Sequence, residues 1–515
     1  MTFRPFGEAS CEHELTKMKH GYKNIFFEGT HFNDEALKAE TYLIIGRRGS
    51  GKSALAQYFT FQTDIKNCSA ITVDKPSEFE SLLENVASRA GRNENDGVNR
   101  ISRLWETIIW GLLFDKFKNE SPEIKAACLV APRRRSSSTL VKKITSDLID
   151  SFTGKSGYLD DLLDDYILDS AFDKPKQAVL EITRTAPVII SIDSFERYDS
   201  ENTAMMMAVA GLVQCAKEMN LSLSDQGIHL KAFVSAEIYP TLTEDAILNT
   251  AKFIEDPVYL HWRPKELARI ICWRYYKYLK SQKLLPVGST NVNWDDWSSV
   301  RDKMWEPFFG EMITNGNSLH EHTFPYILRH TQNRPRQLIR ICNGIAKKAN
   351  ESGDFPFFSA DNIRAGTAAV EKELAREVVN SFARIYPGCG EIVRALAQLP
   401  PEFSGTELSK AAVRTSGSWP SSDRYSAQRF VQLTTELGIV GRVRSGSESV
   451  KTTFEADFEY FEEDRLMIGE HDRCVVHPMF YSTFNMTRRF EKGNEFVVYP
   501  FPDHPAYRDV ERMSV

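Results

Sequence analysis

Short apolar runs alternate with amphipathic stretches along the first half of this chain. The runs at 41–45, 187–192 and 230–234 are rich in valine, isoleucine, leucine and aromatic residues, and a less apolar run lies at 69–74. Continuous apolar runs of this length are typical of strands that are buried on both faces of a parallel sheet. We therefore expect an α/β domain with a parallel sheet, and a long helical insertion between the runs at 69–74 and 187–192.

The pattern changes after about residue 256, where aromatic and amphipathic helical spacing dominates, as in PKELARIICWRYYKYLKSQ at 264–282. This part is predicted to be all-α. From about residue 381 three short helices are expected, followed by two alternating strands at 439–445 and 449–461. The run CVVHPMFY at 474–481 is predicted to be one more strand, leading out of this domain. Three helices and a β-wing predict a winged-helix (α+β) domain.

Length and composition limit the class of protein. The chain has 515 residues, 42% of them hydrophobic and 26% charged, which predicts a globular protein of several domains. A formal net charge of −6 argues against a generally basic, nucleic-acid-coating protein. The sequence has no run of about 18 apolar residues, so no membrane span is predicted. The first residues are polar and acidic, so no secretory signal is predicted either. Eight scattered cysteines without a C-x-x-C pair favour reduced thiols in a cytoplasmic protein over a zinc site.

The strongest chemical signal is the stretch GRRGSGKS at 46–53, which fits G-x-x-x-x-G-K-[ST] between a predicted strand and a predicted helix. Glycines allow backbone N–H groups to approach phosphate oxygens, and the helix N-terminus adds partial positive charge. Lys52 would reach the β- and γ-phosphates of ATP, and the Ser53 hydroxyl would bind Mg²⁺. The alternative is a glycine-rich turn that binds nothing. The predicted nucleotide-binding residues are Gly46, Gly49, Ser50, Gly51, Lys52, Ser53 and Ala54.

Hydrolysis would require a second motif that supplies a carboxylate, since Mg²⁺ prefers carboxylate oxygens. Asp193 stands at the end of the predicted strand 187–192, which makes it the second predicted metal ligand beside Ser53. Glu196, three residues later, would orient or deprotonate the attacking water; the alternative is a solvated acid after a strand. Polar Ser235 and acidic Glu237 follow the run at 230–234, where a side chain could contact the γ-phosphate or simply begin a loop.

These motifs resemble the AAA-like and STAND-like P-loop ATPases, most closely bacterial ATPases with a GRRGSGKSALA loop and an acidic D-S-x-E after the second motif. The similarity extends over most of the chain and includes LHWRPKELARIICWRY at 260–275 and HTQNRPRQLIRICN at 330–343. Arg336 falls where these families have a sensor-2 arginine on a helical lid that closes over the nucleotide, and Arg334 is a neighbouring candidate. The resemblance therefore implies Lys52, Asp193, Glu196 and Arg336 as catalytic residues.

The residues alone give a separate reason to consider Arg336. A helix is predicted to begin at Pro335, which places Arg336 in its first turn. An arginine is always charged and carries a forked set of donors suited to phosphate. An ordinary solvent-exposed arginine is the alternative. The predicted organisation is then a lead-in segment at 1–35, a P-loop ATPase domain at 36–255, a helical lid at 256–380, and a winged helix with a C-terminal extension at 381–515.

The winged helix has two open interpretations. It contains residues of the types that contact DNA. These are Arg424, Gln428, Arg429, Arg442, Arg444 and Lys451. However, residues 387–515 carry 15 lysines and arginines against 19 aspartates and glutamates, and the acidic stretch FEADFEYFEED at 454–464 would repel phosphate. Docking of a protein is the other interpretation. The motif HDRCVVH at 471–477 invites a metal site, but a structurally satisfied histidine pair is preferred.

Two functions follow. In the first, the chain is an oligomeric ATPase switch that uses ATP and Mg²⁺ and controls a partner effector; the resemblance implies a setting in bacterial antiviral defence. In the second, it is an origin-type or regulatory ATPase whose winged helix binds duplex DNA. The charge balance of the C-terminal region favours the first.

Overall fold

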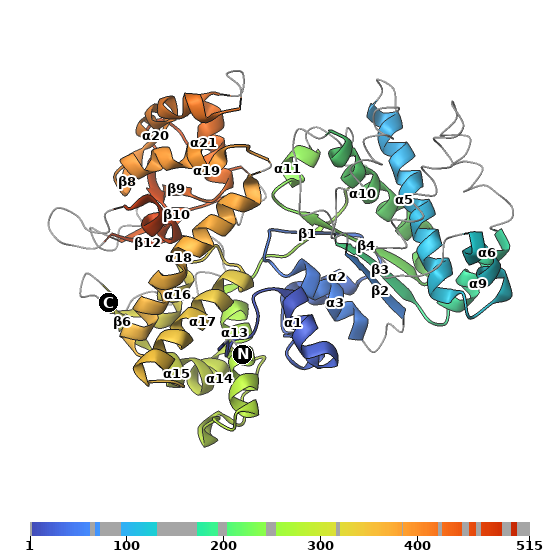
Figure 1. The fold of residues 1–515 in the computed structure, drawn as a ribbon, viewed down its shortest axis with the longest axis horizontal. Coiled ribbons are helices and arrows are strands. Elements are labelled where there is room, and N and C mark those ends of the chain that lie inside the picture. The colour runs from blue at the N-terminus through green and yellow to red at the C-terminus, as the bar shows by residue number, and fades with distance from the viewer. Residues whose placement is uncertain are drawn as a thin grey trace. The chain divides into compact units, whose positions relative to one another are not determined.

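The computed structural model describes residues 3–61, 67–72, 94–130, 173–193, 203–243, 254–315, 320–383, 385–420, 425–444, 453–459, 465–486 and 496–501 (Figure 1). These residues form two compact units. The α/β unit comprises His31–Arg48 and Lys52–Leu260, and the second unit comprises Met1–Thr30, Gly49–Gly51 and His261–Val515.

The α/β unit is built on a five-stranded parallel sheet in the order β2-β3-β4-β1-β5. The strands are β1 (Leu43–Gly46), β2 (Asn67–Thr72), β3 (Val188–Asp193), β4 (Ile228–Ser235) and β5 (Val258–Tyr259). Strands β1 and β3 are buried at every position, as their continuous apolar sequences predict. The predicted parallel sheet is confirmed. Because β4 lies between β1 and β3, the carboxyl ends of these three strands meet at one edge of the sheet.

Helices cover both faces of this sheet. They are α2 (His31–Leu37), α3 (Lys52–Tyr58), α5 (Glu94–Phe117), α6 (Pro122–Val130), α9 (Asp173–Thr183), α10 (Thr203–Leu223) and the short α11 (Tyr239–Thr241). Figure 1 shows α5 and α10 together on one side and α2 and α3 on the other.

The described parts of the insertion between β2 and β3 form helices α5, α6 and α9, and α5 packs closely on α10. A Cβ atom at Gly211 would lie 2.7 Å from Ile101, so glycine allows α5 and α10 to approach each other. The indole of Trp105 on α5 donates a hydrogen bond of 3.0 Å to the carbonyl of Ala208 on α10. The apolar residues of α5, among them Ile108 and Leu113, are buried in the core of this unit.

The middle of the second unit is mainly helical. Its long helices are α13 (Pro264–Ser281), α17 (Pro335–Ser352) and α18 (Ala360–Phe382), and its short helices are α14 (Trp297–Val300), α15 (Glu306–Phe309) and α16 (Thr323–Leu328). A π-helical turn, Arg301–Trp305, joins α14 to α15. A small antiparallel ribbon of β6 (Met312–Thr314) and β7 (His320–His322) interrupts the otherwise helical region. The helix predicted to begin at Pro335 is confirmed as α17.

The N-terminal residues pack against this helical region. Phe6 is fully buried and stacks on Tyr275 of α13, with ring centroids 4.7 Å apart. Glu14 of α1 (Cys11–Met18) accepts two hydrogen bonds, of 2.9 and 2.8 Å, from the guanidinium of Arg274. The segment predicted as a lead-in therefore supplies core contacts to the second unit.

The C-terminal part of the second unit combines helical segments with a five-stranded sheet in the order β12-β10-β9-β11-β8. Its helices are α19 (Cys389–Ile392), α20 (Gly405–Ala412), α21 (Ala427–Glu436) and α22 (Tyr481–Phe484). Its strands are β8 (Glu402–Ser404), β9 (Val440–Val443), β10 (Thr453–Asp457), β11 (Arg473–Val476) and β12 (Val497–Tyr499).

This arrangement agrees with the predicted winged helix, with one difference in the sheet. Strands β9 and β10 pair antiparallel, as the predicted wing requires. Only the first part of the predicted strand at 474–481 is a strand, since β11 ends at Val476 and a 3-10 turn follows at Pro478–Phe480. Strand β11 also does not lead out of the domain; it lies between β9 and β8 and pairs with both. The physical reason is burial, since Cys474, Val475 and Val476 are fully buried there. Among the described residues, no helix is long and apolar enough to cross a membrane.

Candidate functional site

The glycine-rich loop follows β1 and leads directly into α3, as its sequence predicts. Lys52 is the first residue of α3 and is only 5% exposed. Its ammonium group donates hydrogen bonds to the carbonyl oxygens of Gly46, at 2.8 Å, and Arg47, at 3.4 Å. The lysine side chain is thus turned back into the loop that it follows, where its charge faces the space enclosed by the loop backbone.

Ser53 and Asp193 are brought together by the sheet. Asp193 is the last residue of β3 and is 8% exposed. The hydroxyl of Ser53 donates a hydrogen bond of 2.6 Å to Oδ2 of Asp193. A hydroxyl and a carboxylate are oxygen ligands of the kind that Mg²⁺ prefers, and Mg²⁺ usually takes only one or two protein ligands beside water and phosphate. The two side chains therefore fit the predicted metal.

Glu237 holds the loop from the neighbouring strand. The backbone N–H of Arg48 donates a hydrogen bond of 2.9 Å to Oε1 of Glu237, and the hydroxyl of Ser235 donates to its other oxygen. Glu237 is 8% exposed, so this carboxylate is anchored in a largely dry environment. Both residues follow the predicted strand at 230–234, but nothing in the sequence indicates that Glu237 positions the loop.

Three loop residues, Gly49–Gly51, cluster with the second unit. Gly49 and Gly51 have φ values of +85° and +107°, which favour glycine. A Cβ atom at Gly49 would also lie 3.1 Å from Cβ of Arg336. The indole N–H of Trp262 donates a hydrogen bond of 2.6 Å to the carbonyl of Ser50. The sequence gives no signal for the role of Trp262, because nothing in its local pattern distinguishes it from a core aromatic residue.

Arg336 lies in the first turn of α17, as predicted, and its guanidinium has two partners. Its Nε donates to the carbonyl of Ala9 at 3.2 Å, and its Nη1 lies 3.2 Å from Oε1 of Glu377 on α18. Arg340, one turn later on α17, pairs with the same carboxylate at 2.8 Å. The neighbouring candidate, Arg334, is 5% exposed and donates to the Gln332 amide at 2.7 Å, which gives it a structural contact.

The predicted water-orienting residue, Glu196, lies outside the described residues, so the structure bears on only part of the predicted catalytic set. Among the predicted DNA-contacting residues, Arg424 and Lys451 also lie outside them.

The other winged-helix residues differ in their surroundings. Gln428 and Arg429 are exposed on α21. Arg442 donates to the carbonyl of Met467 at 3.2 Å. Arg444 pairs with Asp457 at 2.7 Å and with Glu455 at 3.0 Å, so its charge is largely compensated. Of this set, Gln428 and Arg429 are the residues best presented to a partner.

His477 is fully buried, and hydrogen bonds occupy both of its ring nitrogens. Its Nδ1 accepts from the backbone N–H of Met479, and its Nε2 lies 3.1 Å from the carbonyl of Thr331. Burial lowers the pKa of His477 to about 3, helped by the nearby His330. His471 is exposed. Among the described residues, no group of three His, Cys, Asp or Glu side chains is arranged to hold a metal ion.

Comparison with known proteins finds structural similarity but no family match. No family model matches the chain, and no curated protein matches it. The chain is similar to the ORC2 protein of Aeropyrum pernix, solved in ADPNP–ADP complexes. That structure is 12% identical, with 84% of this chain and 86% of that chain covered and a TM-score of 0.31. The chain is also similar to Drosophila ORC bound to DNA, at 8% identity, 93% and 88% coverage and a TM-score of 0.27. Likeness at this level carries no argument about ligands or activity, and the P-loop fold rests on the sheet and loop described above.

Proposed function

We propose that this chain binds ATP with Mg²⁺ and hydrolyses it. The observation that carries the proposal is the 2.6 Å contact of Ser53 with Asp193, beside a loop into which Lys52 is turned. A glycine-rich loop, a buried ammonium group and a hydroxyl–carboxylate pair at one sheet edge are the groups that a metal-bound triphosphate requires.

Each of the site residues has a distinct role in this proposal. The loop N–H groups and Lys52 bind phosphate oxygens, so Lys52 exchanges its contacts with loop carbonyls for contacts with phosphate. Ser53 and Asp193 hold Mg²⁺, which supplies neutralisation of phosphate charge when it is bound. Glu237 keeps the backbone of Arg48 in place. Glu196 stays the predicted residue for orienting water, on sequence grounds alone.

Arg336 is proposed as the sensor-2 arginine. Its guanidinium is held by Glu377 and by the carbonyl of Ala9, so a phosphate would compete with these partners for it. Glu377 would then be a positioning residue that restrains Arg336 until nucleotide competes for it. Arg336→Ala is expected to lower ATP turnover more than ATP binding.

The biological role is proposed from the resemblance. We propose a cytoplasmic, oligomeric switch whose nucleotide state controls a protein effector, in a bacterial antiviral defence setting. The compensated charge of Arg444 and the net negative charge of residues 387–515 favour a protein partner over duplex DNA.

One observation supports the alternative, a regulatory ATPase that binds duplex DNA through its winged helix. Gln428 and Arg429 are exposed near the start of α21, and both are residue types that read base edges or phosphates. DNA binding that weakens with salt and is lost in a Gln428→Ala/Arg429→Ala variant would support this alternative. Absence of DNA binding at low salt would remove it.

The deciding experiment is measurement of mass in solution for wild type and Glu196→Gln, with and without ATP·Mg²⁺, and with and without duplex DNA. Glu196→Gln is expected to bind ATP without hydrolysing it and to accumulate the assembled form. Assembly with ATP alone supports the oligomeric switch. A shift in mass only when DNA is added supports the alternative, and normal turnover by Glu196→Gln rejects the assignment of that residue.

A further inference from the structure

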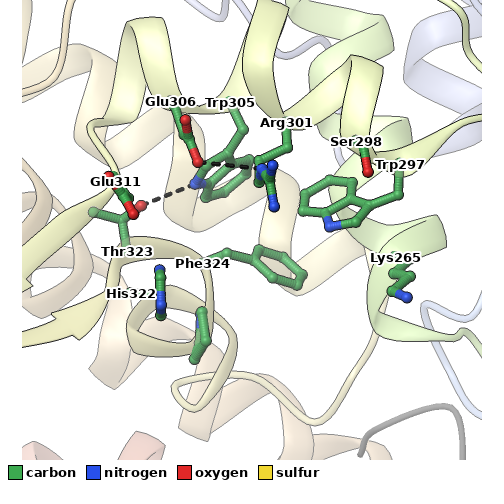
Figure 2. Close-up of a pocket in the computed structure, with 11 residues that line it drawn as sticks. Lys265, Trp297, Ser298, Arg301, Trp305, Glu306, Glu311, His322, Thr323 and Phe324 are labelled. Carbon is green, nitrogen blue, oxygen red and sulfur yellow. Dashed lines mark hydrogen bonds and ion pairs between the residues drawn. The ribbon is translucent and has the colours of Figure 1, made fainter. Parts of the chain in front are cut away.

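The second unit contains a cavity of about 240 Å³ that none of the predicted motifs accounts for. It lies between the segment formed by α14, the π-turn and α15 and the segment formed by β7 and α16 (Figure 2). It is lined by aromatic rings and by charged side chains of both signs. Aromatic rings and charged side chains together suit a ligand that has both an apolar part and a charged group.

Three aromatic side chains form the apolar part of the cavity. The rings of Trp305 and Phe324 meet edge to face with centroids 5.0 Å apart, and Trp297 lies 6.0 Å from Phe324. Trp305 is held in place, because it stacks on Phe309 at 4.2 Å and donates its indole N–H to the hydroxyl of Thr323 at 2.9 Å. The aromatic surface is therefore rigid before any ligand arrives.

The backbone at this cavity has an unusual conformation. Arg301–Trp305 is a π-helical turn, a conformation that is rare and often found at functional sites. Trp297, Arg301 and Trp305 are spaced four residues apart, and Figure 2 shows all three side chains pointing toward the cavity. Residues four apart lie close together on one face of a helix, so these three side chains can line the same wall of the cavity.

The two carboxylates of the cavity lie at one end, and Arg301 pairs with one of them. Glu306 and Glu311 lie at one end near His322, and Lys265 lies at the opposite end beyond Trp297 (Figure 2). Arg301 is shared between Asp302, at 2.9 Å, and Glu306, at 3.3 Å. The carboxylate of Glu311 makes no hydrogen bond or ion pair with any residue that the structure describes. Burial raises the pKa of Glu306 against the opposing effect of Arg301, and Glu311 and Asp302 raise it further.

We propose that this cavity binds a singly charged organic cation, an ammonium or guanidinium group on an apolar stem. The cation would lie between Glu306 and Glu311, and the stem would pack on Trp305, Phe324 and Trp297. The two acids attract the cation by Coulomb interaction, and the aromatic rings give the apolar stem a surface to pack on. Lys265 at the far end opposes a second positive charge, which separates this ligand from linear diamines. The cation comes either from a free amine or from an arginine or lysine side chain of a partner.

The test is calorimetric titration of the full chain with n-butylguanidinium. The controls are n-butanol, which has the stem without the charge, and 1,5-diaminopentane, which has two charges. We expect butylguanidinium to bind, the diamine to bind less tightly, and butanol not to bind measurably. Equal affinity for butanol and butylguanidinium, or no binding of butylguanidinium at millimolar concentration, would overturn the proposal.

Substitutions of the two glutamates test whether the ligand binds in this cavity. Glu311→Gln, at an exposed position where the fold is not at risk, is expected to weaken butylguanidinium about fivefold, and Glu306→Gln/Glu311→Gln is expected to weaken it further. Glu470→Gln, another exposed acid, is the matched control and should change nothing. Unchanged affinity in the double variant would overturn the proposal. A capped Gly-Arg-Gly peptide that binds more tightly than butylguanidinium identifies a protein side chain as the source, and the reverse order identifies a free amine.

Discussion

Ser53 and Asp193 are 140 residues apart in the sequence, yet the Ser53 hydroxyl donates a 2.6 Å hydrogen bond to the Asp193 carboxylate. The parallel sheet produces this contact by aligning the carboxyl ends of β1 and β3 on either side of β4. The pair offers two oxygen atoms to a divalent cation next to the phosphate loop. Four predictions follow from this site and from the buried core.

Replacing Asp193 by asparagine keeps the shape of the side chain and removes its charge. Wild-type affinity for a fluorescent ATP analogue is expected to rise with Mg²⁺, because the metal joins the phosphates to Ser53 and Asp193. In Asp193→Asn this rise should be largely lost. The half-exposed Asp115→Asn is the control, since the Asp115 carboxylate pairs with Lys118 at the end of α5. The same Mg²⁺ dependence in both variants would reject Asp193 as a ligand.

Lys52→Ala removes the buried ammonium group that faces the loop. A hydrogen bond to a charged group is worth about 1.5–3 kcal/mol, so ATP affinity should fall by about 10- to 100-fold or more. Equilibrium binding of labelled ATP measures this, and circular dichroism checks that the variant is folded. Lys118→Ala, at an exposed position, should bind ATP normally. ATP affinity equal to wild type in Lys52→Ala would show that the loop does not bind the phosphates.

Glu237→Gln tests whether this residue holds the phosphate loop. The substitution keeps the size of the side chain but weakens the hydrogen bond from the Arg48 N–H, because a neutral amide is a poorer acceptor than a carboxylate. We expect hydrogen exchange at Arg48 to become about tenfold faster, and ATP affinity to fall. Glu391→Gln, which removes an exposed pair with Arg394, is the control. Unchanged exchange at Arg48 would mean that the contact does not restrain the loop.

His477 should make stability depend on pH. Its pKa is near 6.5 in the unfolded chain and about 3 in the folded protein, so the unfolded state binds the proton more readily. The stabilising contribution is complete above pH 6.5 and is lost as pH falls from 6.5 toward 3. The loss at pH 5 should be about 2 kcal/mol.

Urea unfolding at pH 8 and pH 5 measures this contribution. His477→Gln, which cannot titrate, should lose less stability between these pH values than wild type, whereas the exposed His471→Gln should behave like wild type. An equal pH dependence in wild type and His477→Gln would exclude His477 as the source. The loss of stability between pH 8 and pH 5 is compared between wild type and the variants because other groups in the chain titrate in the same range.

Much of the fold could be predicted because its signals are local. The apolar runs at β1, β3 and β4, the proline at the start of α17, and Ser404 with Glu407 at the start of α20 each determine a nearby element. The position of β11 between β9 and β8 could not be predicted, because an apolar run shows that a strand is buried without showing which strands it pairs with.

The sequence by itself determined the strand–loop–helix of the phosphate loop, since glycine spacing, Lys52 and Ser53 are adjacent in the chain. It also identified Asp193 as the acid at the end of a buried strand. Only the tertiary structure decided that Glu237 holds Arg48, that Glu377 holds Arg336, and that an aromatic cavity gathers Trp297, Trp305 and Phe324. These relationships are contacts between residues of different elements, and such contacts leave no periodic signal in the sequence.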